Sequence, residues 1–122
     1  MLTGARMNGF VPTKDAEKAR SFYEGLLGFA LVSDNQYVAT LRSGEMTIML
    51  QKIDDAVPEH RTILGWEVTN IRDAVSSLSK RGATFERYGW MEQDDLGIWN
   101  SPDGKVAWFK DPDGNVISLS EH

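Results

Sequence analysis

The chain has 122 residues, of which 41% are hydrophobic and 25% charged, a composition typical of a globular protein that excludes a disordered or fibrous chain. The 18 acidic and 13 basic residues give a net charge of −5, which repels phosphate backbones and argues against nucleic acid as a partner. Without cysteine there is neither a disulfide nor a Cys-ligated zinc, and without a signal peptide or a run of roughly 20 apolar residues we expect a cytoplasmic protein with no membrane contact.

The first half of the sequence predicts one strand, one helix and then three more strands. Asp15 is a good N-cap, and apolar residues recur after it at spacings of three and four until Gly28, where the helix is expected to end. Turn-forming residues separate the strand candidates that follow. The predicted strands are residues 8–13, 29–33, 37–42 and 46–51.

The same order of elements returns after a polar linker at residues 51–61. Asn70 is a second N-cap, a second apolar stripe follows it, and Gly82 ends the predicted helix. The motifs Ser-Pro-Asp-Gly at 101–104 and Asp-Pro-Asp-Gly at 111–114 predict turns, because proline fixes φ, aspartate caps its own backbone and glycine permits positive φ. The predicted strands are residues 63–69, 84–88, 97–100, 106–110 and 116–120.

The two helix N-caps, Asp15 and Asn70, stand 55 residues apart, and this spacing indicates an internal repeat. A helix of about 12 residues with one apolar face needs a sheet to cover, and each half alone would bury too little surface. We therefore expect an α+β fold. A single domain over residues 1–122 would hold two βαβββ modules, about 8–52 and 62–120, that form a curved mixed sheet around a cleft. Inward strand positions would line that cleft, while the opposite positions pack on a helix.

Three stretches of the sequence resemble a known family. They are DAEKARSFYEGLLGF at 15–29, WEVTN at 66–70 and FKDPDGNVISL at 109–119. Together they resemble the glyoxalase/bleomycin resistance/dioxygenase superfamily, also called the vicinal oxygen chelate (VOC) fold, over residues 8–120. The resemblance implies paired βαβββ modules around a cleft, usually in a homodimer. In metal-dependent members it also implies a divalent ion held by His, Glu or Gln side chains, which acts as a Lewis acid on the substrate.

The resemblance further implies where metal ligands would stand, at the start of each half's first strand and within each half's last strand. The residues at these positions offer an amide, alkyl groups and a hydroxyl, which give a divalent ion no charge and little basicity. We therefore expect no metal cofactor, although the family calls for one, and expect these residues to contact a ligand instead. They are Asn8, Ile63, Ile48 (Thr47 or Met49 if the alignment slips by one) and Ser118.

His60 is the one histidine close to such a position, and a local insertion could bring it there. Because it lies in the polar linker, three residues before Ile63, we expect it to be exposed to solvent. Ser118 is expected to point into the cleft beside Ser120, where hydroxyl groups can hydrogen-bond a ligand. Phe10, in the first strand, is expected to line the same cleft.

Strand alternation separates the residues around Trp66. We expect Trp66 on the helix side and its neighbours Gly65 and Glu67 on the cleft side, where Gly65 would leave room for a ligand. Glu67 is the only acidic residue predicted on the inner face of a first strand, so it is the one candidate general base, with a raised pKa if it is desolvated. The alternative is a solvated or Arg-paired glutamate at the end of the sheet.

The other three tryptophans, Trp90, Trp99 and Trp108, are candidates for binding a flat organic molecule. The polar segment at residues 90–95 has no strand or helix period and is typical of a lid. An equally weighted alternative is that these tryptophans complete the core or a dimer interface.

From these observations we predict a metal-free, homodimeric protein that binds a small, aromatic organic compound in the cleft, as bleomycin resistance proteins sequester their ligand. One alternative is an enzyme of the glyoxalase or dioxygenase type, a lyase or isomerase acting on a small molecule. A second is a dimeric scaffold without catalytic activity, with a cleft filled by its own side chains.

Overall fold

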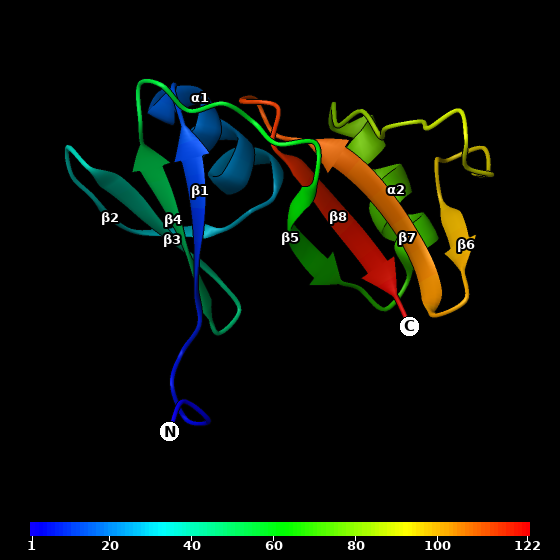
Figure 1. The fold of residues 1–122 in the computed structure, drawn as a ribbon, viewed down its shortest axis with the longest axis horizontal. Helices are drawn as coiled ribbons and strands as arrows, with labels where there is room; N and C mark the ends of the chain where they lie inside the picture. The colour runs from blue at the N-terminus through cyan, green and yellow to red at the C-terminus, as the bar shows by residue number, and fades with distance from the viewer. The chain divides into compact units, whose positions relative to one another are not determined.

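The computed structural model describes all 122 residues, and the chain divides into two compact units, Met1–Pro58 and Glu59–His122. Each unit contains a four-stranded mixed sheet and a helix, in the order strand, helix, three strands (Figure 1). The predicted α+β class and the repeated βαβββ order are therefore confirmed. That the two modules curve around a shared cleft stays a prediction, and the units are described one at a time.

The sheet of the first unit has the strand order β1-β4-β3-β2, in which β1 runs parallel to β4 and the other neighbours are antiparallel. Its buried side chains come from every second strand position and from the helix, as alternation requires. The elements are β1 (Asn8–Thr13), α1 (Ala16–Arg20), η1 (Ser21–Leu26), β2 (Ala30–Asp34), β3 (Val38–Ser43) and β4 (Met46–Lys52).

The first helix begins and ends where the sequence predicts. The side chain of Asp15 accepts a hydrogen bond from the Lys18 N–H at 3.1 Å, and Gly28 adopts a φ of +82° just beyond the last turn. Between these ends the helix differs from the prediction, because its second half, η1, is a π-helix. Apolar spacing shows which face is buried, with Tyr23 fully buried there, but does not distinguish a π-turn from an α-turn.

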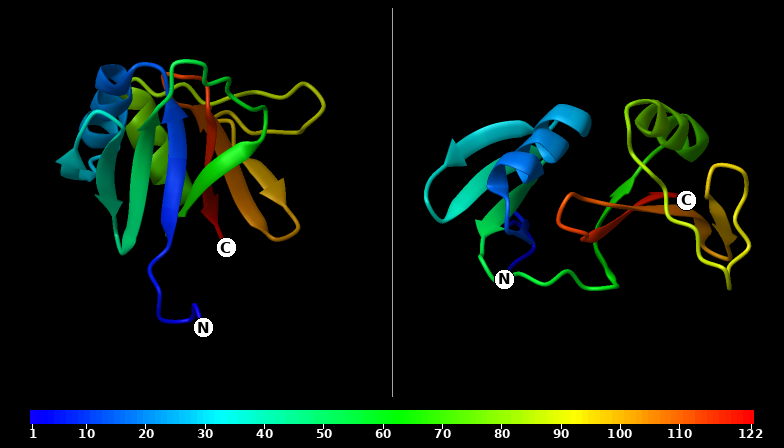
Figure 2. Two further views of the ribbon diagram at one scale, coloured as in Figure 1. Left: turned by 60° about the vertical axis from the view of Figure 1, so that its left-hand side comes forward. Right: turned by 90° about the horizontal axis from the view of Figure 1, so that it is seen from above.

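The second unit repeats this arrangement with the strand order β5-β8-β7-β6 and α2 across one face of the sheet (Figure 2). The Asn70 side chain caps α2 by accepting a hydrogen bond from the Asp73 N–H at 3.1 Å. None of the helices has the length and apolarity needed to cross a lipid bilayer. The elements are β5 (Thr62–Glu67), α2 (Ile71–Lys80), β6 (Trp99–Ser101), β7 (Gly104–Lys110) and β8 (Val116–Glu121).

The predicted strand at residues 84–88 is wrong. Only Phe85 forms a bridge, opposite Phe109, and the Glu86 N–H donates to the Trp108 carbonyl at 2.7 Å. Further pairing stops because the next free N–H, that of Tyr88, donates to the side chain of Gln93 rather than to β7. A side-chain hydrogen bond of this kind leaves no trace in a strand-like sequence pattern.

The Asp-Pro-Asp-Gly turn before β8 is confirmed as a self-contained structure. One carboxylate oxygen of Asp111 accepts from the N–H groups of Asp113 and Asn115 at 3.0 and 2.9 Å, and the other accepts from the Asn115 amide at 2.9 Å. Gly114 closes the turn with a φ of +91°. The hydrogen bonds of Asp111 therefore close the turn and fix the start of β8.

Each sheet has two edge strands, β1 and β2 in the first unit and β5 and β6 in the second. β2 is exposed along its whole length and carries a bulge between Leu31 and Ser33. At its end Asp34 accepts hydrogen bonds from Lys52 at 2.6 Å and Arg20 at 2.9 Å. The Lys52 hydrogen bond is the main reason why the pKa of Asp34 lies below its ordinary value.

Candidate functional site

The face of the second sheet that lies opposite α2, here called the outer face, carries most of the predicted site residues. On β8, Ile117 and Leu119 are buried, and they alternate with the half-buried Ser118 and Ser120. Because successive side chains point to opposite faces of a strand, the two serines lie on the outer face.

Strand register brings the predicted residues of β5 and β7 beside these serines. Gly65 pairs with Ser118, which in turn pairs with Trp108. Glu67 pairs with Ser120, and the same row continues through Val106 to Trp99 on β6. Six predicted residues from four strands therefore share one face: Gly65, Glu67, Trp99, Trp108, Ser118 and Ser120. As predicted, Trp66 alternates with them, opposite Leu119 on the face that meets α2.

Gly65 allows a close approach within this face. A Cβ added at Gly65 would lie 2.6 Å from the Ser118 hydroxyl oxygen, far inside van der Waals contact. The space above Gly65 is thus partly taken by the Ser118 hydroxyl. A ligand over this position would meet a hydrogen-bonding group and not bare backbone.

Four aromatic rings lie in sequence on and beside the outer face, and we call them the aromatic row: Trp99, Trp108, Tyr88 and Trp90. The indoles of Trp99 and Trp108 are stacked, with centroids 6.1 Å apart and planes inclined by 30°. Tyr88 meets Trp108 edge-on at 5.7 Å and Trp90 at 6.1 Å. Both separations are those of interacting aromatic pairs. Trp90, at the end of the row, is 81% exposed.

Tyr88 is the member of the row that the sequence reasoning missed as a site residue. Burial of its ring, followed by the nearby negative charge of Glu86, raises the pKa of its phenol. The dense aromatic content of residues 85–108 could have indicated Tyr88 as a site residue, but the prediction considered only the tryptophans of that segment. The row presents apolar ring faces to a ligand. The hydroxyl of Tyr88 stays neutral at physiological pH.

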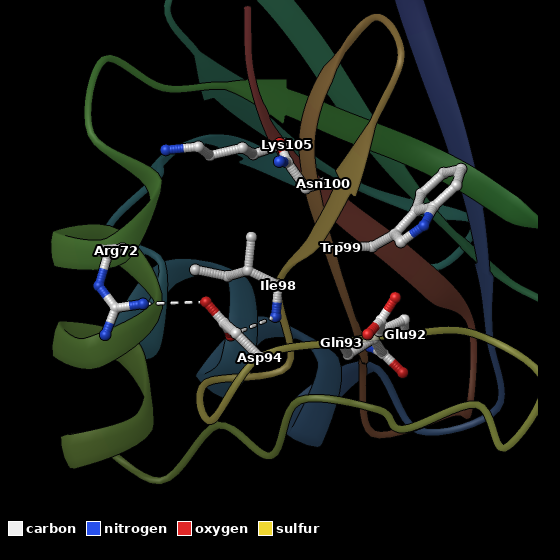
Figure 3. Close-up of a pocket in the computed structure, with 8 residues that line it drawn as sticks. All are labelled: Arg72, Glu92, Gln93, Asp94, Ile98, Trp99, Asn100 and Lys105. Atoms are coloured by element: carbon white, nitrogen blue, oxygen red, sulfur yellow. Dashed lines mark hydrogen bonds and ion pairs between the residues drawn. The ribbon is translucent and has the colours of Figure 1, made fainter.

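A cavity of about 590 Å³ adjoins the row between β6 and α2 (Figure 3). Arg72 on α2 donates to Asp94 at 2.9 Å across it, and Trp99 points away from α2 on the far side of the strand. Charged groups of both signs line the cavity, so it has no strong preference for an anion or a cation. The lining residues are Arg72, Glu92, Gln93, Asp94, Ile98, Trp99, Asn100 and Lys105.

The segment at residues 90–95, expected to be a lid, is fastened to the rest of the loop by hydrogen bonds. One oxygen of the Asp94 carboxylate accepts from the N–H groups of Leu96 and Ile98, both at 2.9 Å. The Arg87 guanidinium donates to the carbonyls of Asp94 and Asp95, both at 2.6 Å. These bonds define the shape of the loop in this structure, and its role as a lid stays a prediction.

The predicted site residues of the first unit are divided between the two faces of its sheet. Asn8 is exposed, and Phe10 is 54% exposed opposite Met49 of β4. Ile48 corrects an expectation: it is 1% exposed and lies in the core, because it falls on the same strand face as the buried Leu50. Both alignment slips of one residue, to Thr47 and to Met49, reach positions that share a face with Phe10.

Ile63 also departs from simple alternation. The register between β5 and β8 shifts at this residue, so that Ile63 occupies a bulge and is 37% exposed. His60 is exposed in the linker, as predicted.

The residues present do not fit the metal site that the family resemblance implies. No group of three or more His, Cys, Asp or Glu side chains is placed to hold one ion. The implied ligand positions carry an amide at Asn8, an alkyl chain at Ile63 and a hydroxyl at Ser118, and Ile48 is enclosed in the core. This donor set lacks the charge and basicity that divalent ions require.

Comparison with known proteins gave concordant results. A model of the Glyoxalase/Bleomycin resistance protein/Dioxygenase superfamily matches residues 6–119. A search of curated proteins found no match. Among solved structures, the chain is 25% identical to TnmS3, an antibiotic binding protein from Streptomyces sp. CB03234, over 99% of this chain and 98% of that one, with a TM-score of 0.75.

Two further structures have the same fold. A superfamily member from Sphaerobacter thermophilus DSM 20745 is 27% identical, with full coverage of both chains and a TM-score of 0.73. Lactoylglutathione lyase from Agrobacterium tumefaciens is 15% identical, covers 97% of this chain and 93% of that chain, and has a TM-score of 0.73. With the family model covering nearly all of the sequence, the chain belongs to the Glyoxalase/Bleomycin resistance protein/Dioxygenase superfamily.

Proposed function

We propose that this protein binds a flat aromatic small molecule on the outer face of its second sheet, without a metal ion. The observation that carries the proposal is the aromatic row, in which two stacked indoles and two further rings are in contact and Trp108 lies beside Ser118 of β8. Stacking on an aromatic side chain is worth about 1–3 kcal/mol per ring contact in a related setting, the binding of nucleic acid bases. Two such contacts would supply about 2–6 of the about 8 kcal/mol that micromolar binding requires, and the polar contacts would supply the rest.

The polar groups of the outer face select the kind of aromatic ligand. Ser118 and Ser120 can each donate or accept a hydrogen bond. Glu67 is exposed at the end of their row and makes no ion pair of its own, so its carboxylate is available to a donor. We therefore propose that the ligand carries a hydroxyl, an amine or a positive charge at the edge of its ring system.

Sequestration suits these features better than catalysis. The superfamily's Lewis-acid chemistry needs an ion that the donor set does not fit, and Glu67 is the only candidate base on this face. The similarity to an antibiotic binding protein over nearly the whole of both chains supports the same reading. The proposal includes a cytoplasmic location and a homodimer. Sedimentation velocity of the purified protein would test the homodimer.

The proposal is tested by calorimetric titration with two flat probes of opposite charge, 9-aminoacridine and anthraquinone-2-sulfonate. We expect saturable binding of at least one probe, with 9-aminoacridine preferred because of Glu67. Trp99→Ala should weaken binding about 5- to 50-fold, since it removes one stacking partner. Trp66→Ala is the matched control, because Trp66 lies on the other face, and it should leave the affinity unchanged.

Two outcomes would contradict the proposal. One is the absence of saturable binding of either probe to the wild-type protein. The other is equal loss of affinity in both tryptophan variants, which would place the ligand away from the outer face. Glu67→Gln separates charge from stacking, because it should remove the preference for the cationic probe while leaving binding of the anionic one intact.

A further inference from the structure

The loop that carries Tyr88 and leads to Trp99 has two limbs, which the side chain of Gln93 joins. The first limb runs from Phe85 to Tyr88 and the second from Gly97 to Trp99. The Gln93 amide nitrogen donates to the carbonyls of Glu86 at 3.0 Å and Gly97 at 2.8 Å, one on each limb. Its amide oxygen accepts from the Tyr88 N–H at 2.8 Å.

Each limb is also tied to the sheet at a tryptophan. The Glu86 N–H donates to the carbonyl of Trp108 at 2.7 Å, which fastens the first limb to β7. The backbone of Gln93 forms a bridge with Trp99, the residue at which the second limb continues into β6. The amide of Gln93 thus completes a continuous path of hydrogen bonds among the three residues whose rings are in contact, Tyr88, Trp108 and Trp99.

The hydrogen-bonding groups around the Gln93 side chain match those of an amide. The backbone of Gly97, whose carbonyl accepts one of these bonds, has a φ of +89°, a conformation that favours glycine. Two carbonyl oxygens face the nitrogen and one N–H faces the oxygen, so donor and acceptor ends are both satisfied. The half-buried setting leaves little water to replace either end.

We propose that Gln93 is the positioning residue of the aromatic row: its amide fixes Tyr88 and Trp99 relative to Trp108 and thereby sets the shape of the ligand surface. This inference rests on the proposed function for its effect on binding, but its effect on ring geometry is independent of any ligand. A carboxylate in place of the amide keeps the acceptor for Tyr88. It loses both donors and faces two carbonyl oxygens with a negative charge.

The test compares Gln93→Glu with Gln36→Glu, which makes the same charge change at an exposed residue of the first unit. Circular dichroism of the ligand-free protein reads the exciton couplet of the stacked Trp99 and Trp108 indoles, and calorimetry reads affinity for 9-aminoacridine. We expect Gln93→Glu to lose most of the couplet and to bind the probe about fivefold more weakly or worse. Gln36→Glu should match the wild type in both measurements.

Gln93→Met is the second variant, since it keeps the length of the side chain, removes all three hydrogen bonds and adds no charge. It should weaken the couplet as well, and it keeps the test decisive if Gln93→Glu does not fold. A couplet that survives in a folded variant at Gln93 would overturn the inference. A couplet lost in a folded variant supports it even if the wild type binds no probe, a result that would overturn the proposed function alone.

Discussion

Two glycines of the second sheet, Gly65 and Gly104, provide a matched pair for testing the packing argument. In both, an added Cβ would meet an oxygen atom far inside contact distance, at 2.6 Å for Gly65 and 2.4 Å for Gly104. The oxygen beside Gly65 is the rotatable hydroxyl of Ser118, whereas the oxygen beside Gly104 is the backbone carbonyl of Glu121. We therefore expect the same substitution, glycine to alanine, to have very different consequences.

The expected magnitudes follow from these contacts. At Gly65 the Ser118 hydroxyl can turn aside at a cost of about 0.5–1.5 kcal/mol, which is offset by about 0.4–1 kcal/mol from the stiffer unfolded chain. Gly65→Ala should thus stay within about 1 kcal/mol of the wild type. At Gly104 the φ of +143° adds about 1–2 kcal/mol of backbone strain to about 1–3 kcal/mol of steric overlap. Gly104→Ala should lose about 2–5 kcal/mol in all.

Urea unfolding followed by tryptophan fluorescence measures the stability of the second unit, which contains both glycines and all four tryptophans. The midpoint for Gly104→Ala should fall by more than about 1 M, while that for Gly65→Ala should barely move. Equal losses would show that Ser118 is unable to rotate and is held by its surroundings. A midpoint for Gly104→Ala equal to that of the wild type would refute the backbone argument itself.

Three further measurements test other parts of the structure. After loading with Zn²⁺, Ni²⁺, Mn²⁺ or Fe²⁺ and desalting, elemental analysis should find no ion near one per chain; retention of one would show that the ligand positions are misassigned. Asp34→Asn should lower the thermal stability slightly at neutral pH. Because Lys52 depresses the pKa of Asp34, the difference in stability between the wild type and Asp34→Asn should vanish as the pH falls through and below the ordinary value of 3.8. It should also shrink in high salt. A stability difference that grows in acid would contradict this assignment. Alkaline absorbance titrations of the wild type and of Tyr88→Phe, subtracted from one another, isolate the Tyr88 phenol. This phenol should ionise above pH 10.0, because burial raises its pKa. A midpoint below that value would mean that water reaches the ring.

Sequence periodicity was sufficient for the fold because both modules repeat the same signals. Asp15 and Asn70 cap the helices, and Gly28 ends the first with the positive φ expected of it. The strand prediction failed where a side chain forms hydrogen bonds with the backbone. Residues 84–88 have a strand-like composition, yet Gln93 takes the hydrogen bond of Tyr88 that a longer strand would have used.

The site was predictable where strand alternation was regular and not where it broke. Alternation along β5 and β8 placed Gly65, Glu67 and Ser118 on one face, as their register shows. Trp108 was predicted only as an aromatic candidate, and the strand register brings it beside Ser118. A one-residue ambiguity in β4 was enough to assign Ile48 to the wrong face, because a slip of one inverts every side chain. The pattern of apolar residues does not indicate the bulge at Ile63.

The edge strands have a consequence for the behaviour of this protein at high concentration. An open edge that exposes apolar residues, as β2 does with Leu31 and Val32, is a template on which another molecule could add a strand and begin a fibril. Here the bulge interrupts the row of free backbone groups, and the charges around Asp34 lie where the added strand would continue. At the other edge β6 is only three residues long. The β2 and β6 edges are thus poorly suited to templating, which disfavours the addition of a strand at these two places.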